Sequence, residues 1–186
     1  FEFDERRGIY RDLVNVDRLE DESRRVYAID VLSVTRDGQS EPFVLMDEGD
    51  YLRIRIGDPD VTITGAHTYQ IQYTVKDGLL EITEEMLEGV QNESLKPGDV
   101  EIYWDLIGPN WSVPIRQASA SVSGPGDVLG ASCWFGYYGS DASCPIDWDG
   151  DTVTFSTYDL MPGQALTGAV VYDGAQFTQP VVEVIL

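Results

Sequence analysis

The stretch from residue 52 to residue 75, LRIRIGDPDVTITGAHTYQIQYTV, constrains the fold more than any other part of the chain. Aliphatic and polar residues alternate on both sides of the turn sequence GDPD at residues 57–60, which is the pattern of half-buried β-strands. Glycine accepts backbone torsions closed to other residues, and proline lacks the N–H that a strand ladder needs. The stretch therefore predicts an antiparallel pair of strands joined at a tight, acidic turn.

Short apolar runs bounded by glycine- and proline-rich turns recur along the rest of the chain. They lie at residues 26–35, 42–47, 100–106, 116–123, 151–156 and 165–172. Residues 179–186 are either a last strand or the start of a linker to an anchor. The pattern predicts an all-β fold, an antiparallel β-sandwich of the immunoglobulin-like or jelly-roll-like kind, formed by a single domain over residues 1–186.

One segment favours a short helix. In residues 82–91, ITEEMLEGVQ, Thr83 can cap the first turn and the two glutamates that follow suit the positive end of a helix dipole. Gly89 interrupts the segment, so we expect only one or two turns.

The charge balance excludes some partners. The chain has 12 basic and 33 acidic residues, for a net charge of −21. Nucleic-acid affinity comes mainly from basic side chains that neutralise phosphates, and anionic lipid heads attract the same residues. We therefore expect no nucleic-acid binding and no direct docking on anionic lipid. The acidic surface either keeps the protein in solution or binds cations.

Cys133 and Cys144 enclose a glycine-containing segment, CWFGYYGSDASC. Such a pair in an exported protein usually forms a disulfide, and two unrelated buried thiols are the alternative. A zinc site would need further ligands, and His67, the single histidine, is far away in sequence. The spacing predicts a disulfide.

Several segments together resemble one family, the extracytoplasmic N-terminal domain of predicted bacterial membrane proteins known as domain-of-unknown-function family 2207. The resemblance is carried by RRGIYRDL at residues 6–13, RIGDPDVTITGAHTYQIQYTV at 55–75 and EIYWDLIGPNWSVPI at 101–115, and extends to the cysteine segment and to LMPGQALTGAVVY at 160–172. It implies a β-rich ectodomain on the extracellular face of the bacterial cytoplasmic membrane. The chain would then lack its membrane anchor and its first strand.

Three features depart from that family's pattern. Residues 82–96 look like an insertion, Asp105 stands where we expect Asn, and residues 179–186 fit poorly. The family has no established activity, so the resemblance implies no catalytic or binding residues.

No catalytic motif stands out. His67 would need a serine and an orienting carboxylate to form a triad, and the chain has no G-x-S-x-G elbow. We interpret His67 as a structural, hydrogen-bonded residue and expect no enzymatic activity. Carboxylates are abundant, so a glycoside hydrolase that acts on cell-wall carbohydrate is the alternative.

Two sets of residues are candidates for binding. Asp147, Asp149 and Asp151 form an acidic turn that superficially resembles a calcium loop without the spacing of an EF-hand. They are our calcium candidates, and a solvated turn is the alternative. No other cofactor is expected.

The second set is aromatic and consists of Trp134, Tyr137, Tyr138 and Trp148. These side chains either pack in the protein or contact a ligand, because aromatic planes stack on the C–H faces of sugar rings. We therefore predict a non-catalytic ectodomain of a membrane-anchored protein that recognises an envelope protein or a glycan.

Overall fold

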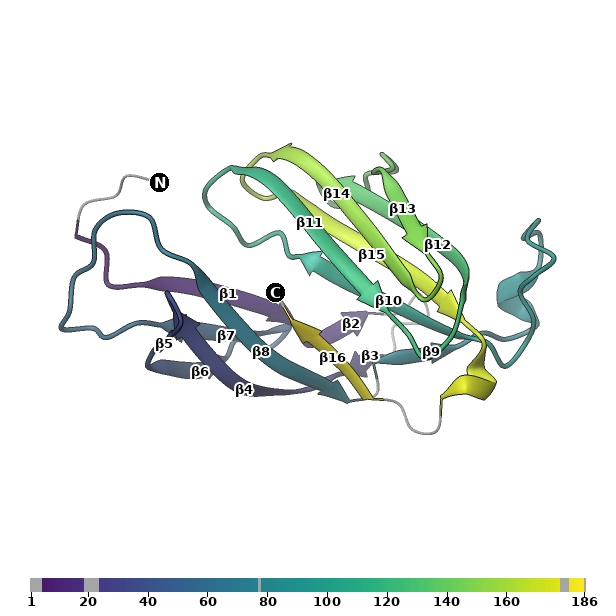
Figure 1. The fold of residues 1–186 in the computed structure, drawn as a ribbon, viewed down its shortest axis with the longest axis horizontal. Coiled ribbons are helices and arrows are strands. Elements are labelled where there is room, and N and C mark those ends of the chain that lie inside the picture. The colour runs from purple at the N-terminus through teal and green to yellow at the C-terminus, as the bar shows by residue number, and fades with distance from the viewer. Residues whose placement is uncertain (1–4, 19–23, 77, 178–180, 186) are drawn as a thin grey trace. The chain divides into compact units, whose positions relative to one another are not determined.

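The computed structural model describes residues 5–18, 24–76, 78–177 and 181–185 (Figure 1). These residues form antiparallel β-sheets with two single-turn 3-10 helices, which confirms the predicted all-β fold. The chain divides into two compact units. Unit 1 comprises Phe1–Asp77 and Val181–Leu186, and unit 2 comprises Gly78–Pro180. Each unit has its own sheets, and the expectation of a single domain over residues 1–186 stays a prediction.

Unit 1 contains two larger sheets and a small hairpin. Their strand orders are β1-β7-β6, β16-β8-β4-β5 and β2-β3. The strands are β1 (Ile9–Val14), β2 (Val16–Arg18), β3 (Arg24–Val26), β4 (Ala28–Arg36), β5 (Gln39–Ser40), β6 (Phe43–Asp47), β7 (Tyr51–Ile56), β8 (Tyr69–Lys76) and β16 (Val181–Ile185). The strand β16 confirms one of the two alternatives for the C-terminal segment.

The two strands predicted within residues 52–75 are both present, as β7 and β8, but their predicted pairing is wrong. β7 pairs with β1 and β6, whereas β8 pairs with β4 and β16. Residues 57–68 are thus a connection between two sheets instead of a hairpin turn. Within this connection Ile63 forms a bridge with Arg6. Alternation of apolar residues identifies a strand and its buried face, but it carries no information about the strand's partner.

The core of unit 1 receives side chains from both larger sheets, as the alternation predicts. The buried apolar residues are Leu13, Tyr27, Val31, Val34, Ile54, Ile56, Ile71, Tyr73 and Val75. On the opposite face of β7, Arg53 makes a bidentate ion pair with Asp12 across β1, with both N–O distances at 2.8 Å. The Arg53 guanidinium also lies over the rings of Tyr10 and Tyr51. This pair and its two aromatic rings fix the register of β1 against β7.

Unit 2 consists of two antiparallel sheets with the orders β12-β15-β10-β9 and β11-β14-β13. The strands are β9 (Leu79–Glu81), β10 (Val100–Ile107), β11 (Ile115–Ser123), β12 (Val128–Gly136), β13 (Ile146–Asp149), β14 (Thr152–Leu160) and β15 (Ala165–Tyr172). The two sheets face each other closely, since a Cβ on Gly168 of β15 would lie 2.7 Å from the Phe155 ring of β14. Trp104 is buried while its neighbour Tyr103 is exposed, as expected of adjacent residues in a strand.

The predicted helix over residues 82–91 is reduced to one 3-10 turn, η1 (Glu85–Leu87). The Thr83 hydroxyl accepts a hydrogen bond from the Met86 amide at 3.4 Å, but the N-cap residue of η1 is Glu84, which makes no side-chain cap hydrogen bond. Met86 and Val90 are exposed. Because Met86 and Val90 stay exposed, burial of these two side chains does not stabilise further turns. A second turn, η2 (Gly174–Gln176), was not predicted.

Candidate functional site

Strand register places three loops of unit 2 at the same end. β15 begins where β12 and β10 end, with Ala165 opposite Gly136 and Leu166 opposite Ile107. In the second sheet β14 ends where β11 begins, and a four-residue turn leads from the end of β14 directly into β15. We call the resulting set of loops the three-loop end. It consists of residues 108–114, 137–145 and 161–164.

Contacts between these loops hold them together. The Gly163 amide donates a hydrogen bond to the Trp111 carbonyl oxygen at 3.2 Å, which joins the first loop to the third. The Tyr137 ring lies beside Gly163, 3.6 Å from where a Cβ of that residue would stand. Within the third loop, the Met161 amide donates to Oε1 of Gln164 at 2.8 Å. The arrangement is therefore one surface rather than three separate loops.

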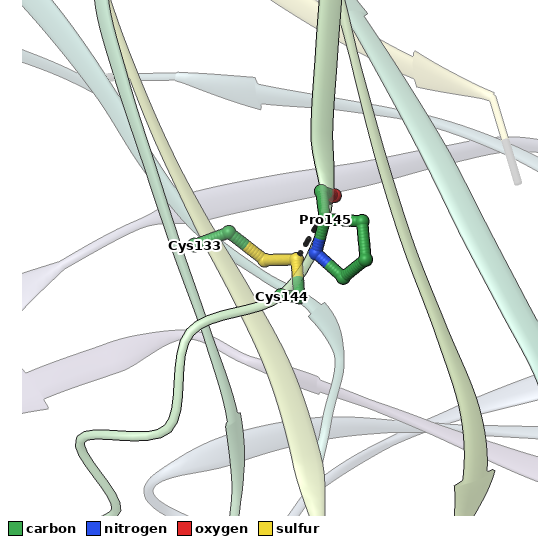
Figure 2. Close-up of a disulfide and its surroundings, with 3 residues drawn as sticks. All are labelled: Cys133, Cys144 and Pro145. Atoms are coloured by element: carbon green, nitrogen blue, oxygen red, sulfur yellow. Dashed lines mark hydrogen bonds between the residues drawn. A yellow bond between two sulfur atoms is a disulfide. The ribbon is translucent and has the colours of Figure 1, made fainter.

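A disulfide between Cys133 and Cys144 fixes the middle loop, with the two Cα atoms 5.5 Å apart (Figure 2). Cys133 belongs to β12, and Cys144 is followed by Pro145 and then by β13. The bond therefore ties one sheet of unit 2 to the chain that enters the other sheet. The predicted disulfide is confirmed. It closes the loop and also fixes the position of the loop relative to both sheets of unit 2.

Hydrogen bonds inside the disulfide loop shape its tip. Gly136 has a φ of 124°. This positive value is accessible to glycine but would be strained for a residue with a side chain. The Ser140 hydroxyl donates to the Phe135 carbonyl oxygen at 2.8 Å, and the Phe135 amide donates to the Ala142 carbonyl oxygen at 2.9 Å. The loop thus folds back on β12 and presents its central residues outward.

The exposed side chains of the three-loop end are mainly apolar or aromatic. Tyr138, at the tip of the disulfide loop, is fully exposed, and both Tyr137 and Met161 are more than half exposed. Nearby at the end of β14, Asp159 has φ 53°, which is an uncommon conformation for a residue with a side chain. Large exposed apolar groups held on constrained loops are typical of recognition surfaces.

The structure separates the four predicted aromatic contacts. Tyr137 and Tyr138 lie together on the disulfide loop. Trp134 is half-buried in β12, where its ring lies 6.3 Å from the Tyr103 ring. Trp148 is exposed but lies opposite Val153, near the start of β14 and therefore away from the three-loop end.

Sequence reasoning missed Trp111 and Met161 as neighbours of the two tyrosines. Each lies in a proline-containing segment between two strands, and that position was the available signal. Their common location follows only from the strand order, which the sequence does not state.

The structure does not gather the three calcium candidates into a site. Asp147 and Asp149 are exposed on β13, and the Asp151 carboxylate accepts a hydrogen bond from the Thr152 hydroxyl at 2.8 Å. Among the residues that the structure describes, no group of three or more His, Cys, Asp or Glu side chains could hold a metal ion. Calcium binding by these three residues stays a prediction.

His67 in unit 1 has the hydrogen bond expected of a structural histidine. Its Nδ1 lies 2.7 Å from Oδ2 of Asp37, and Oδ1 of Asp37 accepts a hydrogen bond from the Thr68 amide at 2.8 Å. The Thr68 amide and His67 both lower the pKa of Asp37. These bonds attach the start of β8 to the turn after β4.

The surroundings of this pair are polar and partly buried. Nε of Arg36 lies 3.0 Å from Oε2 of the buried Glu41, and burial raises the pKa of Tyr69. Nε2 of His67 is buried and has no hydrogen-bond partner among the described residues. The Asp37–His67 pair therefore fixes the corner of unit 1, where the turn after β4 meets the start of β8.

Comparison with known proteins identifies the family. No match was found among curated proteins. Within the described part of the chain, no helix has the length and apolar character needed to cross a membrane. A family model described as the N-terminal domain of a predicted membrane protein (DUF2207) matches residues 1–172. The match covers most of the chain, which therefore belongs to the DUF2207 N-terminal domain family.

Proposed function

We propose that this chain is a non-catalytic recognition domain on the extracellular face of a bacterial cytoplasmic membrane, and that the three-loop end binds a glycan of the cell envelope. The observation that carries the proposal is the exposure of Tyr137, Tyr138 and Met161 on loops tied by a disulfide. Loops held in one arrangement lose little conformational entropy when a ligand binds.

The chemistry of this surface favours a sugar ligand. Tyrosine offers an apolar ring for the C–H face of a sugar and a hydroxyl for a hydrogen bond. Asp141, exposed on the disulfide loop, and Asp159 can accept hydrogen bonds from sugar hydroxyls. The net charge of −21 repels phosphate-rich polymers, so the favoured ligand is a neutral glycan.

The proposed location rests on two observations. The family consists of predicted membrane proteins, and the disulfide requires an oxidising environment, which the cytoplasm of most bacteria does not provide. A domain outside the membrane meets both conditions and has envelope glycans within reach.

Retention on purified peptidoglycan and on an array of neutral oligosaccharides tests the proposal. Replacing both Tyr137 and Tyr138 by Ala should weaken retention by about tenfold or more, because a few aromatic side chains usually supply most of the binding energy of a contact surface. Trp148→Ala is the matched control, since Trp148 is an exposed aromatic residue of the same unit that lies away from the loops.

Two outcomes would contradict the proposal. Equal loss of retention in Trp148→Ala and in the double tyrosine variant would remove the three-loop end as the binding site. Release of new reducing ends from a retained glycan by the wild-type protein, abolished by a carboxylate substitution, would show a hydrolase instead of a binding domain.

A further inference from the structure

The strand β6 lies at the edge of its sheet in unit 1, where the order is β1-β7-β6. Two hydrogen bonds show which of its backbone groups pair with β7. The Gly57 amide donates to the Pro42 carbonyl oxygen at 2.8 Å, just before β6, and the Glu48 amide donates to the Tyr51 carbonyl oxygen at 3.1 Å, just after it.

Hydrogen-bonded and non-hydrogen-bonded pairs alternate along an antiparallel ladder. The even-numbered residues of β6 therefore bond to β7, and the odd-numbered residues turn their N–H and C=O groups away from it. The odd-numbered residues are Phe43, Leu45 and Asp47. No further strand pairs with this side of β6 among the described residues, and no loop hydrogen bond reaches these three backbones. The edge is therefore free to pair.

The side chains of β6 make this edge unusual. Val44, Leu45 and Met46 are 47%, 43% and 37% exposed, so both faces of the strand present apolar groups to solvent. Leu45 is paired with Ile54, which is completely buried. The face of the sheet that is buried at Ile54 is thus exposed to solvent at Leu45, on the edge strand.

Other edge strands of the protein carry the features that normally prevent pairing with another chain. β13 has the carboxylates of Asp147 and Asp149, and β1 carries Arg11 and Asp12. β12 is partly covered by the bridge between Trp134 and Ser143. The described part of β6 has neither a basic residue nor a proline within it.

Charge decides which occupant fits. Asp47, Glu48 and Asp50 follow one another at the end of β6 and in the turn after it. A second copy of this chain would bring its own net charge of −21 close to that of the first, and two molecules of the same charge sign repel each other. A segment of another protein with basic residues beside this turn would be attracted instead.

We propose that the edge of β6 binds an extended segment of a partner protein, which adds an antiparallel strand to the β1-β7-β6 sheet. The added strand has apolar side chains on both faces, which cover Leu45 on one side and Val44 and Met46 on the other. Its basic N-terminal end lies beside Asp47 and Glu48. Backbone hydrogen bonds supply affinity in this mode, and the alternating side chains supply specificity.

A labelled peptide of the sequence KKKVLVTV tests this inference by fluorescence anisotropy with the whole chain. We expect saturable binding, weakened about tenfold or more by Leu45→Lys, because a charge on the open core face opposes strand addition. Val61→Lys is the matched control, since Val61 is an exposed apolar residue of unit 1 outside the strands. The same peptide N-methylated at alternate backbone amides keeps its side chains but loses its donors, so it should not bind.

Protection of the β6 amides from hydrogen exchange upon peptide binding supports the inference independently of any substitution. Three results would overturn it. The first is the absence of saturable binding, and the second is equal binding of the N-methylated peptide. The third is a concentration-dependent dimer in sedimentation that is lost in Leu45→Lys, which would assign the edge to a second copy of this chain. Circular dichroism and the melting temperature of Leu45→Lys confirm that the variant is folded before its binding is compared.

Discussion

Gly8 and Gly57 lie back to back in unit 1, each with its Cα facing the backbone of the other. Their φ angles are 120° and 118°. A Cβ on Gly8 would overlap the carbonyl oxygen of Ile56, and a Cβ on Gly57 would overlap that of Arg7. The turn sequence GDPD, which opens the connection between two sheets, is therefore constrained at Gly57 by a close backbone contact as well as by its torsions.

Gly57→Ala should destabilise the protein by about 2–4 kcal/mol, because a left-handed torsion and a clash with the backbone add together. Gly65→Ala is the control. Gly65 has a φ of 105°, but nothing lies within 4 Å of its Cβ position, so only the torsional cost of about 1 kcal/mol applies. Urea unfolding of both variants measures the difference, and equal destabilisation would show that the Gly8–Gly57 contact has no energetic role.

Tyr172 makes unit 2 sensitive to alkaline pH. Its ring is completely buried, and its hydroxyl donates to the carbonyl oxygens of Asp151 and Val122 at 3.0 and 3.3 Å. Burial raises the pKa of Tyr172 to about 12, with a further contribution from the Asp151 charge. The unfolded state releases this proton at a pH of about 10. Stability from this group is therefore fully present below about pH 10 and is lost as the pH rises toward about 12.

Tyr172→Phe should lower the free energy of unfolding at neutral pH by about 1–2 kcal/mol, since the hydrogen bonds of the buried hydroxyl to the Asp151 and Val122 carbonyl oxygens are lost. It should also flatten the loss of stability above about pH 10. Tyr158→Phe, at an exposed tyrosine of the same unit, serves as control. Denaturant unfolding followed from pH 8 to pH 11 checks both effects, and parallel curves for wild type and Tyr172→Phe would contradict the assignment.

The sequence predicted local structure better than long-range pairing. The alternation in residues 52–75 correctly gave the strands β7 and β8. Their separation into different sheets depends on β1, β4, β6 and β16, and no local pattern encodes such partners. The segment 128–136 was not predicted as a strand, because glycines and adjacent large residues interrupt its alternation. It is nevertheless β12, held by its pairing with β15.

The site was predictable in the same partial way. The two cysteines predicted the closed loop on which Tyr137 and Tyr138 lie, but for both residues the sequence left packing and ligand contact as alternatives. Trp111 and Met161 join them only because three strand ends coincide. The aromatic residues proposed from the sequence as ligand contacts therefore included Trp148, which strand register places away from the three-loop end.

Asp37 should stabilise unit 1 more at neutral pH than in acid. Hydrogen bonds from the Thr68 amide and His67 lower the pKa of Asp37 below its ordinary value. Its contribution is therefore present above about pH 4 and is lost as the pH falls through the lower, folded-state pKa. Asp37→Asn keeps an acceptor for Thr68 and tolerates the φ of 53° at this position, but it removes the charge.

Asp37→Asn should thus lose stability relative to wild type at pH 7 and approach it at pH 3, whereas Asp37→Ala should be less stable than both at either pH. Thermal melts at the two pH values measure this. A difference between wild type and Asp37→Asn that does not change with pH would mean that ionisation of Asp37 has no part in holding the corner.

The disulfide between Cys133 and Cys144 should support both the stability of unit 2 and the binding proposed for the three-loop end. The two cysteines lie 11 positions apart in the sequence, and closing a loop of this length stabilises a fold by roughly 3 kcal/mol in the chain-entropy model. Replacing both cysteines by Ser should lower the free energy of unfolding by about that amount, in urea titrations compared with those of the oxidised wild type. It should also weaken glycan retention under conditions where the variant stays folded, because Tyr137 and Tyr138 are no longer held in place.

Unchanged unfolding on reduction of the wild type, with both thiols alkylated in the native protein, would contradict the bond itself. Lost stability with unchanged retention would instead mean that the disulfide serves the fold and that the tyrosines need no constraint to bind.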